Sequence, residues 1–154
     1  MSASTSRRLE TAGFCAISSL PKGPNGRALC RWCSVEVAPP ARTFCSNACV
    51  HEWKIRTQAD YAKMHVAKRD DGICALCRVD TFAALRPLPN REFPSREARR
   101  CFDMDHIVPV VEGGGACGLD NLRTLCRPCH RAVTAELQKR RAAARRAAKT
   151  GGEP

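Results

Sequence analysis

Four close pairs of cysteines constrain the fold of this chain more than any other feature. The pairs are Cys30 with Cys33, Cys45 with Cys49, Cys74 with Cys77, and Cys126 with Cys129. Two thiolates on one tight turn can reach the same metal ion, whereas a disulfide framework needs no such close pairing. The total of 11 cysteines is odd, which argues against a fully oxidised secreted scaffold and favours a reducing compartment. The spacing therefore predicts metal sites built from thiolates.

The paired cysteines are expected to form two structural zinc sites. The C-terminal site would use two CxxC pairs with 48 residues between them, Cys74, Cys77, Cys126 and Cys129. The N-terminal site would use Cys30, Cys33, Cys45 and Cys49. In that site His51 could replace Cys49 as a ligand, and in the other His130 could replace Cys129. Four thiolates leave no open position for water or substrate, so neither site is expected to be catalytic.

Zinc would compensate for a thin hydrophobic core. The chain has 154 residues, with only five phenylalanines, two tryptophans and one tyrosine, and this length suits one domain or one domain with a small module. Structural zinc contributes folding free energy on the order of 10 kcal/mol near neutral pH. Helix-prone and strand-like segments both occur, so we expect a small, zinc-stabilised α+β protein.

The charge of the chain favours a polyanionic partner. Lysine and arginine total 26 against 15 acidic residues, a net charge of +11, which is typical of nucleic-acid binding. An acidic membrane surface is the alternative, but the C-terminal run "QKRRAAARRAAK" lacks the large apolar residues of a membrane-inserting helix. No segment has the length of apolar sequence that spans a bilayer, and the N-terminus lacks a signal-peptide pattern. We expect nucleic acid as the partner, which the family resemblance described below narrows to DNA, and no membrane association.

Three segments have recognisable local structure. Residues 50–68 are helix-prone, with Thr57 and Asp60 as a capping pair for a second helix start, and Gly72 should end that helix. The stretch "CFDMDHIVPVV" alternates like a strand that ends near Pro109. The knuckle "CRPCH" should run into a helix with Pro128 in its first turn.

Four polar residues in this C-terminal part could share one site, namely Asp105, His106, Asn121 and His130. The four-cysteine clip joins the turn before the strand to the turn that begins the last helix. Neighbouring residues of a strand point to opposite faces. Asp105 and His106 can therefore serve one site only if the strand ends or bends there.

The order of these residues resembles the HNH endonuclease family, also called the ββα-metal nucleases. The resemblance runs through "DHIVPVVEGGG", "LDNLRTLC" and "CRPCH", between the two CxxC pairs. Including the extra N-terminal knuckle, it covers about residues 29–140. It implies a small, treble-clef-like ββα-metal core with an added zinc knuckle and helices.

The resemblance also implies roles for the four residues in phosphodiester hydrolysis. His106 would be the general base, and Asn121 would accept a hydrogen bond that fixes the tautomer of His106. Asp105 and His130 would hold one catalytic divalent ion, Mg²⁺ or Mn²⁺. Some family members have a further histidine at the position of Thr134, so a sparser metal shell is expected here.

Four segments are expected. Composition indicates a disordered leader at 1–26 and a basic tail at 139–154, and the resemblance suggests a zinc knuckle and helix at 27–57 and an HNH nuclease domain at 58–138. The nucleic-acid-binding residues would be Arg131, Arg140, Arg141 and Arg145. A monomer is favoured, located in the cytoplasm, or associated with the nucleoid if the source is bacterial.

Other interpretations of the same residues remain open. The chain could be a zinc-finger module that binds nucleic acid or a protein without catalysis, or the CxxC pairs could serve thiol redox chemistry. His106 could be a core histidine bonded to Asp105, and Asn121 only a turn residue. His51 and His65 lie in helix-prone sequence without a carboxylate cluster, and ordinary packing roles are expected for them.

Overall fold

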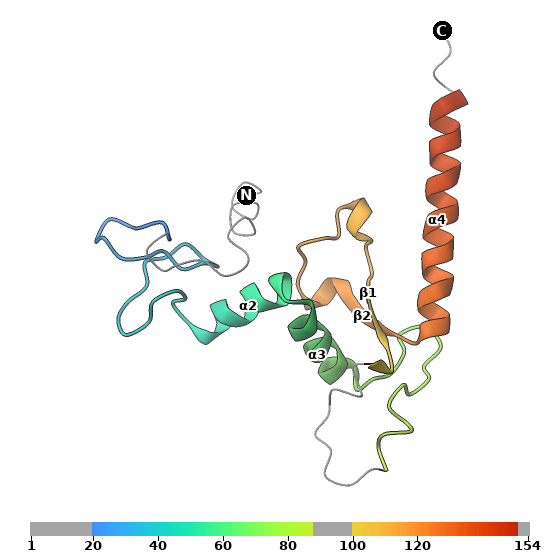
Figure 1. Ribbon diagram of the computed structural model, residues 1–154, viewed down its shortest axis with the longest axis horizontal. Coiled ribbons are helices and arrows are strands. Elements are labelled where there is room, and N and C mark those ends of the chain that lie inside the picture. The colour runs from blue at the N-terminus through green and yellow to red at the C-terminus, as the bar shows by residue number, and fades with distance from the viewer. Residues whose placement is uncertain (1–19, 88–99, 151–154) are drawn as a thin grey trace. The chain divides into compact units, whose positions relative to one another are not determined.

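The computed structural model describes residues 20–87 and 100–150, and these form two compact units. The first unit comprises the residues up to His65 together with Val108–Asn121, and the second comprises Val66–Ile107 and the chain from Leu122 onward. Helices α2, α3 and α4 and one two-stranded sheet, β1 with β2, are the main elements of the described residues (Figure 1), together with two short 3-10 helices, Val110–Glu112 and Leu119–Asn121. The predicted α+β class is confirmed. Residues 1–19 of the predicted leader lie outside the described residues.

The N-terminal part of the first unit is a compact turn structure around the first cysteine cluster. Short antiparallel bridges join Lys22 to Ala28 and Leu29 to Glu36. Residues 20–26, assigned to the leader from the sequence, take part in this structure, because Leu20 is buried and the N–H of Leu29 donates to the carbonyl of Pro21. Backbone pairing therefore begins in the segment before Cys30.

Two consecutive helices follow, as the sequence predicts. Helix α2 spans Asn47–Thr57, and the Ser46 side chain caps it by accepting the N–H of Cys49 at 3.2 Å. Helix α3 spans Ala59–Asp70. The Thr57 hydroxyl donates to the carbonyl of Trp53 at 2.7 Å, a bond within α2 and not the predicted cap of the second helix.

Gly72 ends α3 for a steric reason. Its φ is +71°, a conformation that residues with a side chain rarely adopt, and its N–H donates to the carbonyl of Ala67. A Cβ atom at this position would lie 2.3 Å from the ring of Phe82. Only glycine allows the chain to leave the helix so close to this buried ring.

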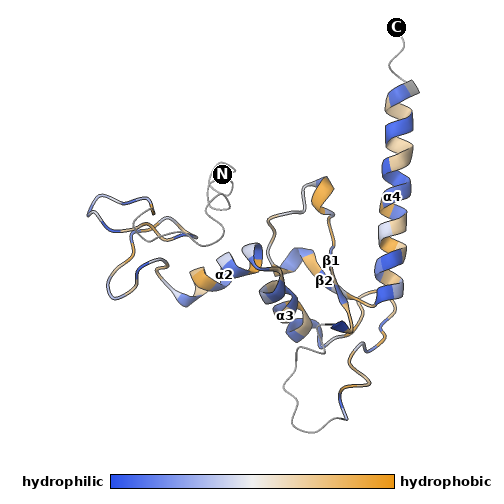
Figure 2. Cartoon of the chain, viewed as in Figure 1, coloured by the Kyte–Doolittle hydropathy of each residue, from blue (hydrophilic) through white to orange (hydrophobic). Residues whose placement is uncertain are grey.

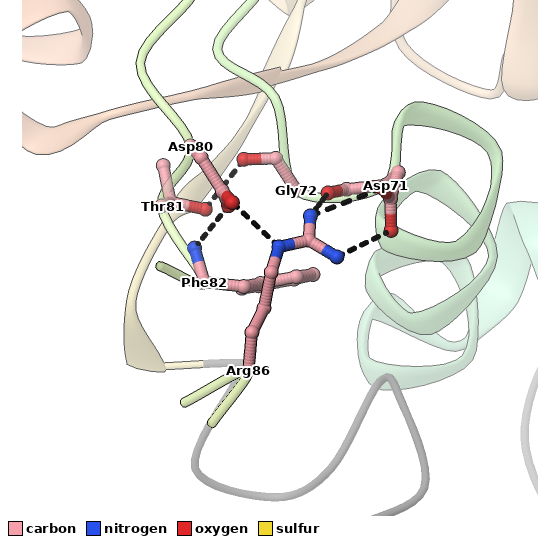
Figure 3. Close-up of polar contacts among 6 residues, drawn as sticks. All are labelled: Asp71, Gly72, Asp80, Thr81, Phe82 and Arg86. Carbon is pink, nitrogen blue, oxygen red and sulfur yellow. Dashed lines mark hydrogen bonds and ion pairs between the residues drawn. The ribbon is translucent and has the colours of Figure 1, made fainter. Parts of the chain in front are cut away.

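The segment between α3 and the sheet is tied together by Arg86 (Figure 3). Its guanidinium bonds the Asp80 carboxylate at 2.5 Å and both the carboxylate and the carbonyl of Asp71, at 3.0 and 2.9 Å. The Thr81 hydroxyl donates to the carbonyl of Gly72 at 2.7 Å. The bond from Arg86 holds the pKa of Asp80 below its usual range. This network fixes the start of the turn that carries Cys74 and Cys77.

The sheet of the second unit is short and antiparallel. Strand β1, Asp103–His106, pairs with β2, Leu122–Leu125, so that Asp103 is opposite Leu125 and Asp105 is opposite Arg123. The predicted strand ends at His106, before Pro109. Helix α4, Arg127–Thr150, begins directly after β2 with Pro128 in its first turn, as predicted.

Two small clusters form the core of this unit. Phe82 and Phe102 meet edge to face with ring centroids 5.8 Å apart, and Ala67 packs beside them. Leu125 packs against the buried thiol side chains of Cys74 and Cys126. The cysteine cluster is thus part of the core itself. This explains how a chain with few aromatic residues can form a buried core.

The edge of β2 that faces away from β1 is also paired. Thr124 donates its N–H to the Asp70 carboxylate at 2.9 Å and accepts the N–H of Ala75 at 2.8 Å. Arg69 donates to the carbonyl of Leu122 at 2.7 Å. The end of α3 therefore substitutes for a third strand, with Asp70 as its central acceptor.

Asp70 is expected to contribute pH-dependent stability. Burial raises the pKa of Asp70, but hydrogen bonds from Arg69 and Thr124 outweigh it, and the pKa is lowered overall. Such a carboxylate stabilises the fold fully above its unfolded pKa of about 3.9, and the contribution is lost as pH falls through the lower folded value. Asp70→Asn should lower the free energy of unfolding by about 1 to 3 kcal/mol at neutral pH.

Urea titrations of wild type and variant at several pH values test this expectation. The difference in unfolding free energy should be constant from pH 8 to about pH 5 and shrink only below about pH 4. Asp60→Asn, an exposed position on the same helix, is the matched control and should change stability by less than about 0.5 kcal/mol. A pH-independent difference for Asp70→Asn would contradict the assignment.

Candidate functional site

The structure groups the eight paired cysteines as the sequence predicts. In the first unit, the sulfur atoms of Cys30, Cys33, Cys45 and Cys49 all lie within 4.8 Å of one another. The Sγ of Cys45 is 3.4 Å from those of both Cys33 and Cys49. His51 bonds the Tyr61 hydroxyl through Nδ1 at 3.0 Å instead. Cys49, and not His51, completes this cluster.

The second cluster has the same geometry. The sulfur atoms of Cys74, Cys77, Cys126 and Cys129 also lie within 4.8 Å of one another, with the Sγ atoms of Cys77 and Cys126 3.6 Å apart. A tetrahedral ion with Zn–S bonds of about 2.3 Å separates its sulfur ligands by about 3.8 Å. Both clusters therefore fit a four-thiolate metal site, and His130 is not part of this one.

The acidity of the thiols differs within each cluster. Burial raises the pKa of Cys74, but backbone N–H groups of Cys126, Cys77 and Leu76 outweigh it and lower the pKa to about 6. Hydrogen bonds that the Cys129 thiol donates to Cys126 and Cys77 raise the pKa of Cys129 to about 12. The backbone thus favours one thiolate, Cys74, while Cys129 retains a proton that a bound cation would displace.

The first cluster repeats this pattern. Burial raises the pKa of Cys30, but backbone N–H groups of Cys33, Cys45 and Trp32 outweigh it and lower the pKa to about 7. Hydrogen bonds that the Cys45 thiol donates to Cys33 and Cys49 raise the pKa of Cys45 to about 12. The shared pattern of backbone donors indicates that both knuckles are preformed to hold negative sulfur.

The second cluster fixes the position of His130. This residue follows Cys129 directly, and its N–H donates to the carbonyl of Cys126 at 2.9 Å in the first turn of α4. Its Nδ1 lies 3.1 Å from Oδ2 of Asp103, the first residue of β1. The contact joins the start of the strand to the start of the helix.

Asp105 has a different partner. Arg123, opposite it on β2, contacts Oδ2 of Asp105 with Nε at 2.9 Å and with a terminal guanidinium nitrogen at 2.8 Å. The Asp105 side chain is 14% exposed and that of Arg123 20%. Asp103 and Asp105 are two residues apart in β1, so both point to the same face of the sheet. Asp105 therefore lies on the same sheet face as Asp103, with its carboxylate held by Arg123.

His106 is the last residue of β1 and is half-buried. The sequence required the strand to end or bend at Asp105 and His106 if both were to serve one site; in the structure both residues are still paired with β2, and the strand ends after His106. Its backbone is held by pairing with Leu122. His106 thus marks the exit of the chain from the sheet.

Asn121 belongs to the first unit and holds the loop 108–114. Its Oδ1 accepts the N–H of Val108 at 2.8 Å, and its Nδ2 donates to the carbonyls of Val108 and Gly114 at 3.1 and 3.0 Å. The amide oxygen that the resemblance assigned to His106 is thus directed to the backbone. A side-chain amide can satisfy the N–H and the carbonyl of one residue together, as a paired strand does.

The sequence interpretation missed two residues, Asp103 and Arg123. Alternation along "FDMDH" places Asp103 on the face of Asp105, and this signal was available. The position of Arg123 opposite Asp105 depends on the strand register, which the sequence alone does not define. Within the described part of the chain, no cluster of three or more metal-binding side chains at this close spacing occurs besides the two cysteine sets.

Helix α4 carries the basic residues predicted to contact nucleic acid. At about 100° per residue, Arg131, Arg141 and Arg145 fall on one face of the helix, whereas Arg140 falls on the other. Arg131, Arg140, Arg141 and Arg145 are all exposed, and hydrophilic residues occur along the length of α4 (Figure 2). No helix that the structure describes is long and apolar enough to cross a bilayer.

Comparison with known proteins agrees with this arrangement. Residues 90–136 match the family model of the HNH endonucleases. The chain is similar to the DNA annealing helicase and endonuclease ZRANB3 of mouse, at 32% identity over 79% of this chain, and to the ZRANB3 proteins of cattle and human, at 35% and 34% over 67%.

The match is confined to a small part of these relatives. The chain spans 14% of the length of the mouse protein and 12% of the length of the other two. No solved structure is significantly similar to the chain. The family model nevertheless covers both strands and the first turn of α4. The resemblance read from the sequence is therefore confirmed, and residues 90–136 are an HNH endonuclease segment.

Proposed function

We propose that this chain is a metal-dependent endonuclease that hydrolyses DNA phosphodiester bonds and nicks one strand per active site. The observation that carries the proposal is the meeting of β1 and α4 within the HNH segment, where Asp103 contacts His130 and Asp105 lies on the same sheet face. Carboxylates and an imidazole at one place are the groups that metal-assisted hydrolysis requires.

The donor set suits a hard divalent ion. Asp105 and His130 would be the ligands, because Oδ1 of Asp105 and Nε2 of His130 are the atoms not used in their contacts with Arg123 and Asp103. One carboxylate and one imidazole leave several positions for water and phosphate oxygens, which favours Mg²⁺ or Mn²⁺. A bound ion would supply Lewis-acid stabilisation of the charge that develops on the phosphate. The two cysteine clusters would hold Zn²⁺, which thiolates prefer.

His106 would be the general base. An imidazole is the side chain best suited to take a proton from water around neutral pH. The end of β1 fixes its backbone, and the loop that leaves His106 is held by the Asn121 amide. We therefore assign to Asn121 the role of a positioning residue, acting through this loop.

The basic face of α4 would contact the DNA backbone. Arg131, Arg141 and Arg145 are spaced to follow one side of a duplex, and each phosphate contact adds affinity without reading sequence. Arg140 would add charge from the opposite face. DNA as substrate together with thiolate metal sites implies a reducing, DNA-containing compartment inside the cell, and we favour a monomer.

Plasmid nicking is the direct test of this proposal. Zinc-loaded full-length protein with Mg²⁺ or Mn²⁺ should convert supercoiled plasmid to the open circular form before any linear product is seen. Chelation of the added ion should stop the conversion. The alternative function, a zinc-finger module without catalysis, predicts DNA binding with intact plasmid at every protein concentration, and that outcome would overturn the nuclease proposal.

A further inference from the structure

Asp103 has no assigned role in hydrolysis, yet its carboxylate contacts the imidazole of His130. Its Oδ2 lies 3.1 Å from Nδ1 of His130, and each side chain is 36% exposed. A carboxylate oxygen this close to Nδ1 favours a proton on that nitrogen, because an imidazole N–H can donate and an ionised carboxylate can only accept.

The contact determines which nitrogen of His130 can bind a metal. A neutral imidazole carries one proton, and a carboxylate at Nδ1 keeps the proton there. The lone pair is then on Nε2. Histidines that ligate metals usually donate their other ring N–H to a carboxylate or carbonyl, and loss of that partner typically costs about 10-fold to 100-fold in metal affinity.

Both partners are held by backbone structure independent of the contact. Asp103 pairs with Leu125, the residue before Cys126, and the N–H of His130 donates to the carbonyl of Cys126. The second cysteine cluster therefore sets the distance between the strand and the imidazole. A surface pair of this kind contributes little stability of its own, about 0 to 1 kcal/mol, so structural stability does not explain it.

We propose that Asp103 is the positioning residue of the catalytic metal site. It holds His130 as the Nδ1–H tautomer with Nε2 directed to the ion, while Asp105, on the same face two residues further on, supplies the carboxylate ligand. The two acids of β1 thus have different roles. Asp103 orients the imidazole of His130, and Asp105 binds the ion. This inference rests on the proposed nuclease function, because it concerns the same ion.

The test measures the tautomer and metal binding, and neither depends on cleavage. Nitrogen-15 NMR of the imidazole rings in the zinc-loaded full chain should show His130 as Nδ1–H in the wild type and as a tautomer mixture in Asp103→Ala. Electron paramagnetic resonance titration with Mn²⁺, without DNA, should show affinity reduced about 10-fold to 100-fold in Asp103→Ala. Asp103→Asn keeps an oxygen acceptor and should lose less than about 10-fold. Asp60→Asn is the control and should match wild type.

Each outcome decides the proposal. Unchanged tautomer and unchanged Mn²⁺ affinity in Asp103→Ala would overturn it, as would the absence of Mn²⁺ binding in the wild type. An equally severe loss in Asp103→Asn would make Asp103 a direct ligand, which also overturns the positioning role. If the wild type binds Mn²⁺ with the expected tautomer but does not nick DNA, the nuclease function fails while the assignment of Asp103 stands. Zinc content should be the same in all variants.

Discussion

Replacing His106 by alanine is expected to lower the rate of plasmid nicking by about 100-fold to 10,000-fold. The reason is chemical: without the imidazole, water must be deprotonated by bulk solvent, while the remaining groups still bind metal and phosphate. The side chain is half-buried at the end of a strand, so its removal should leave the fold intact. Single-turnover nicking, measured at saturating protein, checks the prediction.

The matched control for this variant is His51→Ala. His51 is a half-buried histidine of α2 that contacts Tyr61 and His65, and its loss should leave nicking within a few-fold of wild type. DNA affinity and zinc content should be unchanged in both variants. Equal activity of His106→Ala and wild type would remove His106 from the role of base. A loss of zinc in His106→Ala would show that the variant fails to fold and not that it fails in catalysis.

The metal frame and the element order could be predicted from sequence because they depend on local spacing. Two CxxC pairs on tight turns have few ways to reach one ion, and the structure groups Cys74, Cys77, Cys126 and Cys129 accordingly. The two-helix break after Thr57 and the helix end before Gly72 also follow from local residue chemistry. These features require no knowledge of distant contacts.

The partners of the polar site residues could not be predicted in this way. Whether Asp105 contacts His130 or Arg123 depends on the register between β1 and β2, and a shift of one residue would change every cross-strand pair. No local sequence pattern indicates that the backbone of the loop 108–114 would hydrogen-bond the side-chain amide of Asn121. Side-chain pairing across a sheet is a tertiary property.

The difference between Asp103 and Asp105 shows how this affects functional assignment. A family pattern transfers a role to the acid directly before His106, and that assignment is retained here as a proposal. The contact made by His130, however, is with the acid three residues before His106. Both acids lie on one face of β1, but they have different partners. Helix α4 begins near Leu125, which pairs with Asp103, whereas Asp105 pairs with Arg123.

Loss of either cysteine cluster should have the largest effect on the fold. Cys77 in the second cluster and Cys45 in the first are exposed, and serine in place of an exposed thiol ordinarily changes stability by less than about 0.5 kcal/mol. If each sulfur is a zinc ligand, its loss instead removes a site worth on the order of 10 kcal/mol. That is comparable to the whole stability of a typical domain, about 5 to 15 kcal/mol.

We therefore expect Cys77→Ser to unfold the sheet and α4 start and to abolish nicking, with zinc content falling from two ions per chain to one. Cys45→Ser should lose one zinc as well but unfold only the N-terminal knuckle, because its cluster lies in the other compact unit. Cys117→Ser, outside both clusters, is the control and should keep two ions. Elemental zinc analysis and amide-exchange NMR measure these outcomes. If Cys77→Ser kept both zinc ions and the unfolding midpoint of the wild type, the exposed thiol would not be a ligand. The position of His130 near β1 would then need an explanation that does not involve metal.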